Sequence, residues 1–86
     1  MGSKKDFVLT HHARTALAKR RIPVSWVERA LTSPEATEAD LLDSTLEHHL
    51  LRIPEFGNRV LRVIVNKQSR PWRVVTAFFD RRRKIP

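Results

Sequence analysis

Apolar residues recur at helical spacing near the N-terminus of the chain. Ala13, Ala16 and Leu17 stand at positions i, i+3 and i+4, which predicts a helix over about residues 11–21. Thr10 immediately precedes this stretch and is a suitable N-cap, because its hydroxyl can accept a hydrogen bond from a free backbone N–H of the first turn. The pattern therefore predicts a short amphipathic first helix.

A second helix is predicted a few residues later. Ser25 and Glu28 have the spacing of a capping box, in which each side chain accepts a hydrogen bond from the other residue's backbone N–H. Pro34 disfavours helical backbone at the residue before it, so the helix should end near Ser33. Its buried stripe is expected to consist of Val27, Ala30 and Leu31.

Beyond these helices the pattern changes to short apolar runs rich in β-branched and aromatic residues. Asn58–Asn66 and Trp72–Asp80 are the clearest predicted strands, and Thr45–Ile53 is a third. Pro54–Asn58 supplies turn residues, and Lys67–Pro71 has the length of a hairpin connection. The C-terminal half is therefore expected to form a sheet.

Two segments are ambiguous. Phe7–Leu9 either begins a strand or docks against the first helix, and Glu35–Asp43 is either an edge strand or an irregular acidic segment. Two N-terminal helices followed by strands predict an α+β fold, with the helices packed on a three- to four-stranded antiparallel sheet. Residues 1–86 suffice for a single domain, in which 1–6 should be frayed and 81–86 should form a basic tail.

Strand parity predicts which side chains share a face of the sheet. Arg62 lies between Leu61 and Val63 in an otherwise aliphatic run, so it points away from both. On the last strand, Val74 and Thr76 are expected on one face. Depending on the register, Arg62 and Thr76 converge either with His48 and Arg52 or with Glu47 and His49.

The composition is that of a globular protein, with 41% hydrophobic residues and no cysteine. No apolar stretch approaches the length of a membrane span, and no signal peptide opens the chain. We therefore expect a cytoplasmic protein with no membrane partner.

The net charge of +8 is unevenly distributed. Residues 1–31 contain seven basic and two acidic residues, and residues 52–86 contain ten basic and two acidic residues. The intervening residues 32–51 contain five acidic residues and no Lys or Arg. Basic clusters of this kind are typical of nucleic-acid binding, although a surface charged for solubility is the alternative.

Arg62 is the most unusual residue of the predicted strands, because a guanidinium removed from water must be paired or hydrogen-bonded. Its planar fork of donors suits a phosphate group, for which Arg52 is a second candidate. The alternative for both residues is a structural ion pair with one of the acids at 35–47.

Four histidines occur as two adjacent pairs, His11-His12 and His48-His49. Adjacent side chains diverge on a helix and point to opposite faces of a strand, so neither pair forms a chelate by itself. We expect no metal and no cofactor. A histidine at the start of the first helix is either a general acid or base, or an exposed residue of the helix start.

The chain contains Leu9–Ala13, then Arg20–Ile22 and then the run Val27–Pro34 at the second helix. This order resembles the opening of the bacterial family known as domain of unknown function 4258. Leu61–Val65 and Val74–Phe78 resemble the family's paired final strands.

This resemblance implies a fold similar to RelE-like and barnase/EndoU-like ribonuclease toxins, with N-terminal helices on a four-stranded antiparallel sheet. The residues that match the family's polar positions are His12, Arg21 (or Arg20), Arg62 and Thr76.

The leading hypothesis is a toxin-like, metal-independent endoribonuclease that binds RNA phosphates through arginines on the sheet. In this hypothesis His12 is the acid or base, and Arg62 is the phosphate or transition-state ligand. The expected substrate-binding residues are Arg21, Arg52, Thr76, Arg81 and Arg82. The alternatives are a non-catalytic nucleic-acid-binding module and an interaction domain for an acidic, antitoxin-like protein.

Overall fold

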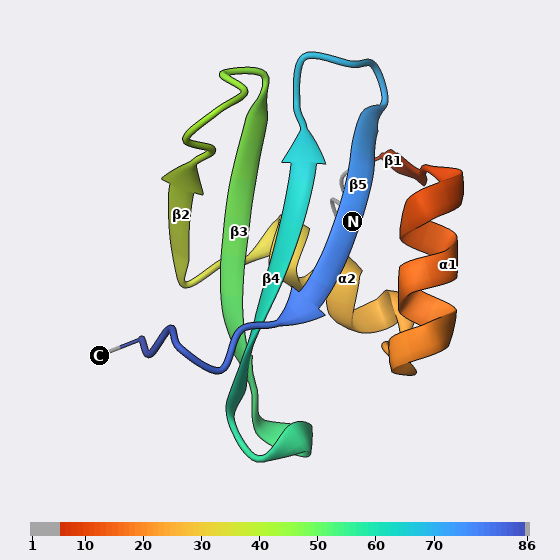
Figure 1. Ribbon diagram of the computed structural model, residues 1–86. Helices are drawn as coiled ribbons and strands as arrows, with labels where there is room; N and C mark the ends of the chain where they lie inside the picture. The colour runs from red at the N-terminus through yellow and green to blue at the C-terminus, as the bar shows by residue number, and fades with distance from the viewer. Residues whose placement is uncertain (1–5, 86) are drawn as a thin grey trace.

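A computed structural model describes residues 6–85 as two helices and a five-stranded sheet, which is an α+β fold (Figure 1). The sheet order is β1-β5-β4-β3-β2, and every neighbouring pair is antiparallel except β1 and β5. The elements are β1 (Phe7–Leu9), α1 (His11–Arg20), α2 (Val24–Thr32), β2 (Ala36–Ala39), β3 (Leu46–Ile53), the 3-10 turn η1 (Pro54–Phe56), β4 (Arg59–Asn66) and β5 (Trp72–Phe79).

The predicted three- to four-stranded antiparallel sheet is wrong in strand number and direction. The observed sheet has five strands and is mixed, because β1 pairs with β5 in parallel. Phe7 pairs with Trp72 and Leu9 with Val74, in parallel. A strand of three residues is too short to show periodicity, and its partner lies more than sixty positions away along the chain. Of the residues expected to fray, 1–5 lie outside the described residues, and the Asp6 carbonyl accepts from the Trp72 N–H at 3.3 Å.

The two helices begin differently. Thr10 caps α1 as predicted, since its Oγ1 accepts from the Ala13 N–H at 3.0 Å. The predicted capping box of the second helix is wrong, because α2 already begins at Val24 and has Pro23 at its N-cap. Ser25 therefore lies within the first turn rather than before it. Proline has no side-chain acceptor, but its backbone carbonyl accepts from the Trp26 N–H at 3.0 Å, so one free N–H of the first turn is satisfied without a side-chain cap.

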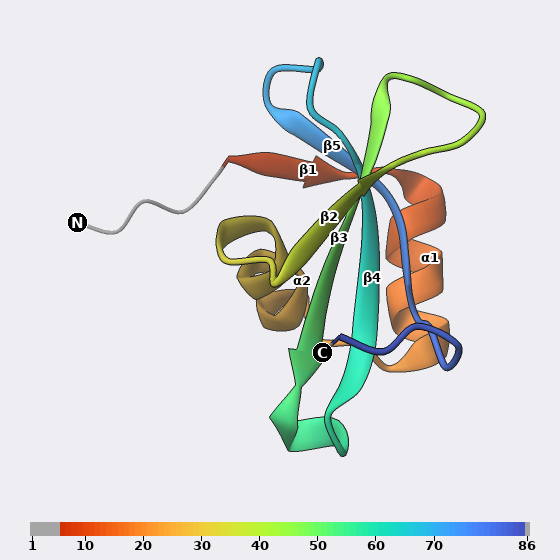
Figure 2. The ribbon, with the colours of Figure 1, turned by 90° about the vertical axis from the view of Figure 1, so that its left-hand side faces the viewer.

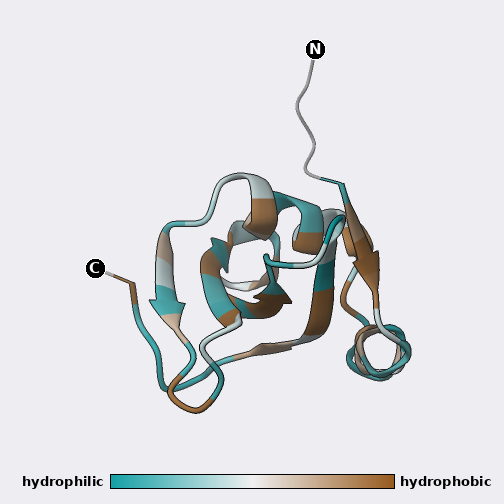
Figure 3. Cartoon of the chain, turned by 90° about the horizontal axis from the view of Figure 1, so that it is seen from above, coloured by the Kyte–Doolittle hydropathy of each residue, from teal (hydrophilic) through white to brown (hydrophobic). Residues whose placement is uncertain are grey.

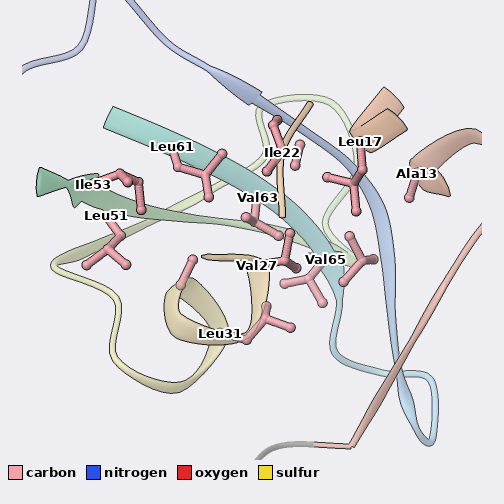
Figure 4. Close-up of a cluster of buried hydrophobic side chains, with 13 residues drawn as sticks. Ala13, Leu17, Ile22, Val27, Leu31, Leu51, Ile53, Leu61, Val63 and Val65 are labelled. Atoms are coloured by element: carbon pink, nitrogen blue, oxygen red, sulfur yellow. The ribbon is translucent and has the colours of Figure 1, made fainter. Parts of the chain in front are cut away.

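Both helices contribute to one core. α1 packs along β5 and β1, while α2 packs across β3 and β4 (Figures 1 and 3). The facing side of the sheet supplies Leu61, Val63 and Val65, all of which are fully buried (Figure 4). The remaining buried members of this cluster are Ala13, Leu17, Ile22, Val27, Ala30, Leu31, Leu51, Ile53, Val74 and Ala77.

A bulge in β5 changes the predicted face of Val74. Thr76 pairs with Ile64, but Val74 rather than Val75 pairs with Val65. The extra residue reverses the alternation, so Val74 enters the helix-side core while Thr76 stays on the opposite face. The prediction that Val74 and Thr76 share a face is therefore wrong, because parity holds only in an uninterrupted strand.

The segment after β5 crosses the helix-free face of the sheet. It runs past β4 and β3 toward β2, on the side of the strands opposite α2 (Figures 1 and 2). Its contacts include a hydrogen bond from the Asp80 N–H to the Val60 carbonyl at 2.9 Å, and the Arg83 guanidinium lies 2.8 Å from Glu38 of β2. The expected basic tail is thus anchored over residues 80–83, while Pro86 lies outside the described residues.

Candidate nucleic-acid interface

Arg62 lies on the helix-free face, at the centre of an ion-pair network. Its Nε and Nη2 donate to Asp80 Oδ2 at 3.0 and 2.7 Å, and its Nη1 donates to Glu38 Oε1 at 3.2 Å. The Arg62 side chain is 12% exposed and that of Asp80 is 17% exposed. Each guanidinium nitrogen therefore has a partner inside the protein, which is the structural alternative predicted for this residue.

His48 extends this network toward β2. Its Nδ1 lies 2.7 Å from Arg62 Nη1, and its Nε2 lies 2.7 Å from Asp40 Oδ1. Because a guanidinium can only donate, Nδ1 must accept, and Nε2 carries the hydrogen that is donated to Asp40. The hydrogen bond from His48 lowers the pKa of Asp40, helped by the backbone N–H groups of Leu42 and Asp43.

Asp80 connects the network to the chain after β5. Its Oδ1 accepts from the backbone N–H groups of Arg82 and Arg83 at 3.0 and 3.3 Å. Burial raises the pKa of Asp80, but these bonds and that from Arg62 outweigh burial, so the pKa lies below its ordinary value. One carboxylate thus fixes both Arg62 and the start of the basic segment.

Beside Asp80 lies a hollow of about 550 Å³, which we call the tail groove. It is bounded by the β3–β4 connection and by residues 79–85. The cations that line it are Arg52, Arg59, Arg81, Arg83 and Lys84, and Asp80 is its one acidic lining residue among those described.

Three cations of the tail groove have no acidic partner among residues 6–85. Within residues 6–85, no carboxylate lies within ion-pair distance of Arg59, Arg81 or Lys84, and all three are exposed. The guanidinium of Arg59 lies 4.8 Å from the centre of the Phe56 ring, which orients it without neutralising its charge. The groove therefore presents uncompensated positive charge to solvent.

The register brings some of the predicted residues together. The face of the sheet that carries Arg62 also carries His48, Arg52 and Thr76. This is the first of the two predicted arrangements. Arg52 also lines the tail groove, but its guanidinium pairs with Glu35 at 2.6 Å, which is the ion pair considered as its alternative. Arg81 lines the groove, and Arg82 is exposed beside it.

Two predicted residues lie elsewhere. His12 is exposed in the first turn of α1 and takes part in none of the hydrogen bonds or ion pairs around Arg62. Arg21 is exposed at the C-cap of α1, where its φ of 56° closes the helix in a left-handed conformation. The fold therefore does not join the histidine of the first helix to the arginine network.

The other predicted arrangement, Glu47 with His49, forms a separate cluster on the helix side. His49 is buried, with Nδ1 3.1 Å from the Ala30 carbonyl and Nε2 2.9 Å from Glu47 Oε1. Lys67 Nζ donates to the same carboxylate oxygen at 2.7 Å and lies 4.9 Å from the ring centre of Trp72. The hydrogen bond from Lys67 lowers the pKa of Glu47 despite partial burial, and His49 adds to this effect. This cluster ties β3 to α2 and to the β4–β5 connection.

Sequence reasoning missed Arg59, Arg83 and Lys84 as residues of the groove. The sequence predicted a basic tail that includes Arg83 and Lys84, but it did not predict the path of that tail across the sheet. Arg59 follows the left-handed pair Gly57-Asn58, so a turn signal preceded it in the sequence.

No cluster of three or more His, Cys, Asp or Glu side chains suited to a metal ion occurs among the described residues. None of the helices in that part of the chain is long and apolar enough to cross a membrane.

The fold and the groove together define a small α+β protein with a cationic surface hollow. The chain matches the family described as "Domain of unknown function (DUF4258)" over residues 9–79, from the end of β1 to the end of β5, and it belongs to that family. Neither the curated proteins nor the solved structures contain a match to it.

Proposed function

We propose that this protein binds RNA by its phosphate backbone in the tail groove. The observation that carries the proposal is the set of three exposed cations, Arg59, Arg81 and Lys84, which have no acidic partner within residues 6–85 and surround a hollow of about 550 Å³. Phosphates of a nucleic-acid strand would neutralise these charges and release condensed counterions, which favours binding at low salt.

RNA is favoured over other polyanions by two considerations. Arginine presents a planar fork of donors that matches phosphate oxygens, and two of the three free cations are arginines. The sequence-based expectation of a fold similar to ribonuclease toxins points to an RNA ligand in particular. Single-stranded RNA suits the open groove best, because its backbone can bend to follow closely spaced cations.

The proposal is tested by measuring the affinity for a fluorescently labelled single-stranded RNA over a series of salt concentrations. The groove variant is Arg59→Gln/Arg81→Gln/Lys84→Gln. The matched control, Lys19→Gln/Arg70→Gln/Arg73→Gln, removes the same charge from exposed cations away from the groove. The groove variant should lose at least about tenfold in affinity, and its salt slope should fall by about 2, since each phosphate contact on a single strand contributes about 0.7.

Equal losses in the two variants would contradict the tail groove as the binding site, and so would wild-type affinity that is independent of salt.

Cleavage of the bound RNA is a second candidate, favoured by the hydrogen-bonded chain Asp40–His48–Arg62. A carboxylate that orients an imidazole is a common arrangement of a general base. In the resting protein, however, His48 Nδ1 faces Arg62, and the guanidinium has no free donor nitrogen. Binding therefore has more support than catalysis.

The same RNA, recovered from the binding assay in EDTA, separates the two candidates. Intact RNA supports binding alone. Fragments that persist in His12→Ala but disappear in His48→Gln would support a metal-independent endoribonuclease centred on Arg62, and the opposite result would restore His12 as the acid or base.

A further inference from the structure

Two adjacent leucines point into solvent on the connection between β2 and β3. Leu41 and Leu42 are each 97% exposed, whereas the next most exposed large apolar residue among residues 6–85, Val8, is 46% exposed. Two leucines that are almost fully exposed contribute no hydrophobic burial to the folded monomer, so a contact that removes them from water is favourable.

The connection holds these leucines in a fixed shape. Asp40 Oδ2 accepts from the backbone N–H groups of Leu42 and Asp43 at 3.1 and 2.9 Å. Asp43 Oδ1 accepts from the N–H and the hydroxyl of Thr45 at 2.9 and 2.6 Å. Because the backbone is already ordered, docking of this leucine loop (residues 40–45) costs little further conformational entropy.

A hollow of about 490 Å³ between α1, β1 and the start of α2 has the complementary character. We call it the helix groove. Its rim carries Arg14 and Arg21, which are both exposed. Its other lining residues are apolar, namely Leu9, Leu17, Ala18, Ile22, Pro23 and Val24.

The charges of the two surfaces are also complementary. Asp40 and Asp43 flank the leucines, and neither is within ion-pair distance of a Lys or Arg among residues 6–85. Arg14 and Arg21 likewise have no carboxylate partner in that range. Hydrogen bonds from Thr45 lower the pKa of Asp43, so its charge persists at neutral pH.

The leucine loop and the helix groove lie at opposite ends of the molecule, the loop above β2 and β3 and the groove beside the α1–α2 junction (Figure 1). A chain therefore cannot fill its own groove. We propose that the leucine loop of one copy docks into the helix groove of a second copy, with Leu41 and Leu42 inserted and the two aspartates facing Arg14 and Arg21.

Because the loop and the groove lie at opposite ends of each copy, docking joins the copies head to tail, and the contact is heterologous. Each pair leaves one groove and one loop free, so assembly continues to a ring or an open chain rather than stopping at a dimer. Weak, concentration-dependent oligomers are expected, since one loop in one groove buries less surface than a stable dimer requires.

Sedimentation velocity over a range of protein concentrations tests the proposal. The loop variant Leu41→Ser/Leu42→Ser changes side chains that pack against nothing in the monomer. The groove variant Ala18→Glu/Val24→Glu adds bulk and negative charge at two exposed lining residues. Wild type should form a growing series of oligomers, and each variant alone should associate at least about tenfold more weakly.

An equimolar mixture of the two variants gives the decisive result. The intact loop of one variant can enter the intact groove of the other, but no further copy can add, so a 1:1 dimer and nothing larger should appear. Circular dichroism of each variant confirms that both are folded.

The proposal is overturned if wild type stays monomeric up to its solubility limit or if the loop variant assembles as wild type does. It is also overturned if the mixture stays monomeric or forms larger oligomers.

Discussion

Arg62 and its partners form a connected network of charged side chains on the helix-free face. The guanidinium is held by Asp80 and Glu38, and Glu38 also pairs with Arg83. A charge this far removed from water is tolerated only because carboxylates and a histidine surround it. The network therefore contributes to the fold by fastening residues 80–83 onto β2 and β4.

Replacing Arg62 by Met should lower the free energy of unfolding by about 3 kcal/mol, because it leaves the largely buried carboxylate of Asp80 without its cationic partner. Arg52→Met is the matched control. Its pair with Glu35 is more exposed, at 43% and 29% for the two side chains, and should be worth about 1 kcal/mol or less. Urea denaturation measures both. Similar losses of unfolding free energy in the two variants would contradict the larger contribution of the Arg62 network to stability.

At the scale of elements, Thr10 joins α1 to the sheet. Its hydroxyl accepts from the Ala13 N–H and donates to the Val75 carbonyl at 3.2 Å, and its own N–H donates to the Val74 carbonyl at 3.1 Å. The first two bonds use the side chain, and the Val75 carbonyl lies at the bulge of β5. Thr10 thus caps α1 and also donates a hydrogen bond to a backbone carbonyl at the bulge of β5.

Thr10→Val keeps the shape of the side chain but removes both hydroxyl hydrogen bonds. It should lower the free energy of unfolding by about 1 to 2 kcal/mol, the range measured for the loss of a helix cap. Thr15→Val, on the exposed side of the same helix, controls for the lower helix propensity of valine. Thermal unfolding followed by circular dichroism compares the two. A loss at Thr15 as large as that at Thr10 would contradict the capping role.

At the scale of the whole molecule, ion pairs link segments that are distant in sequence. The hydrogen bond from Arg29 lowers the pKa of Glu55 to about 2, and Lys67 lowers that of Glu47. The pKa of Asp80 is also lowered. Each carboxyl thus has a folded-state pKa below its unfolded value, so these pairs stabilise the folded protein fully above the unfolded value of about 4.

The melting temperature should therefore be nearly constant from pH 7 to about pH 5 and should fall between about pH 4 and pH 2, as the carboxyls take up protons through their lowered pKa values. Loss of negative charge from a chain of net charge +8 adds electrostatic repulsion in the same range. Calorimetry in low and moderate salt measures both effects. A melting temperature that is unchanged or higher below pH 4 would refute this account.

Much of the fold was predictable because its signals are local. Thr10 capped α1, and Pro34 placed the end of α2 close to Ser33. The strands β3, β4 and β5 agree with their predicted ranges to within a residue at each end. Long apolar runs bounded by turn residues specify strands almost independently of what surrounds them.

The candidate site was less predictable because it depends on register and on the path of the C-terminal segment. The sequence indicated that Arg62 needed a partner, but not that Asp80, eighteen positions away, would provide it. It indicated a basic tail, but not that the tail would turn beside Arg59 to enclose a groove. Contacts of this kind arise from long-range strand pairing, which a periodic pattern does not specify.

By itself, the sequence determined two helices, three long strands, a charged residue in an aliphatic strand and a basic C-terminus. The tertiary structure alone decided that β1 joins the sheet in parallel, that a bulge turns Val74 inward, and that the donors of Arg62 are occupied within the protein. The physical reason is that backbone propensity acts over a few residues. The partners of a charge, by contrast, are chosen only when distant strands come into register.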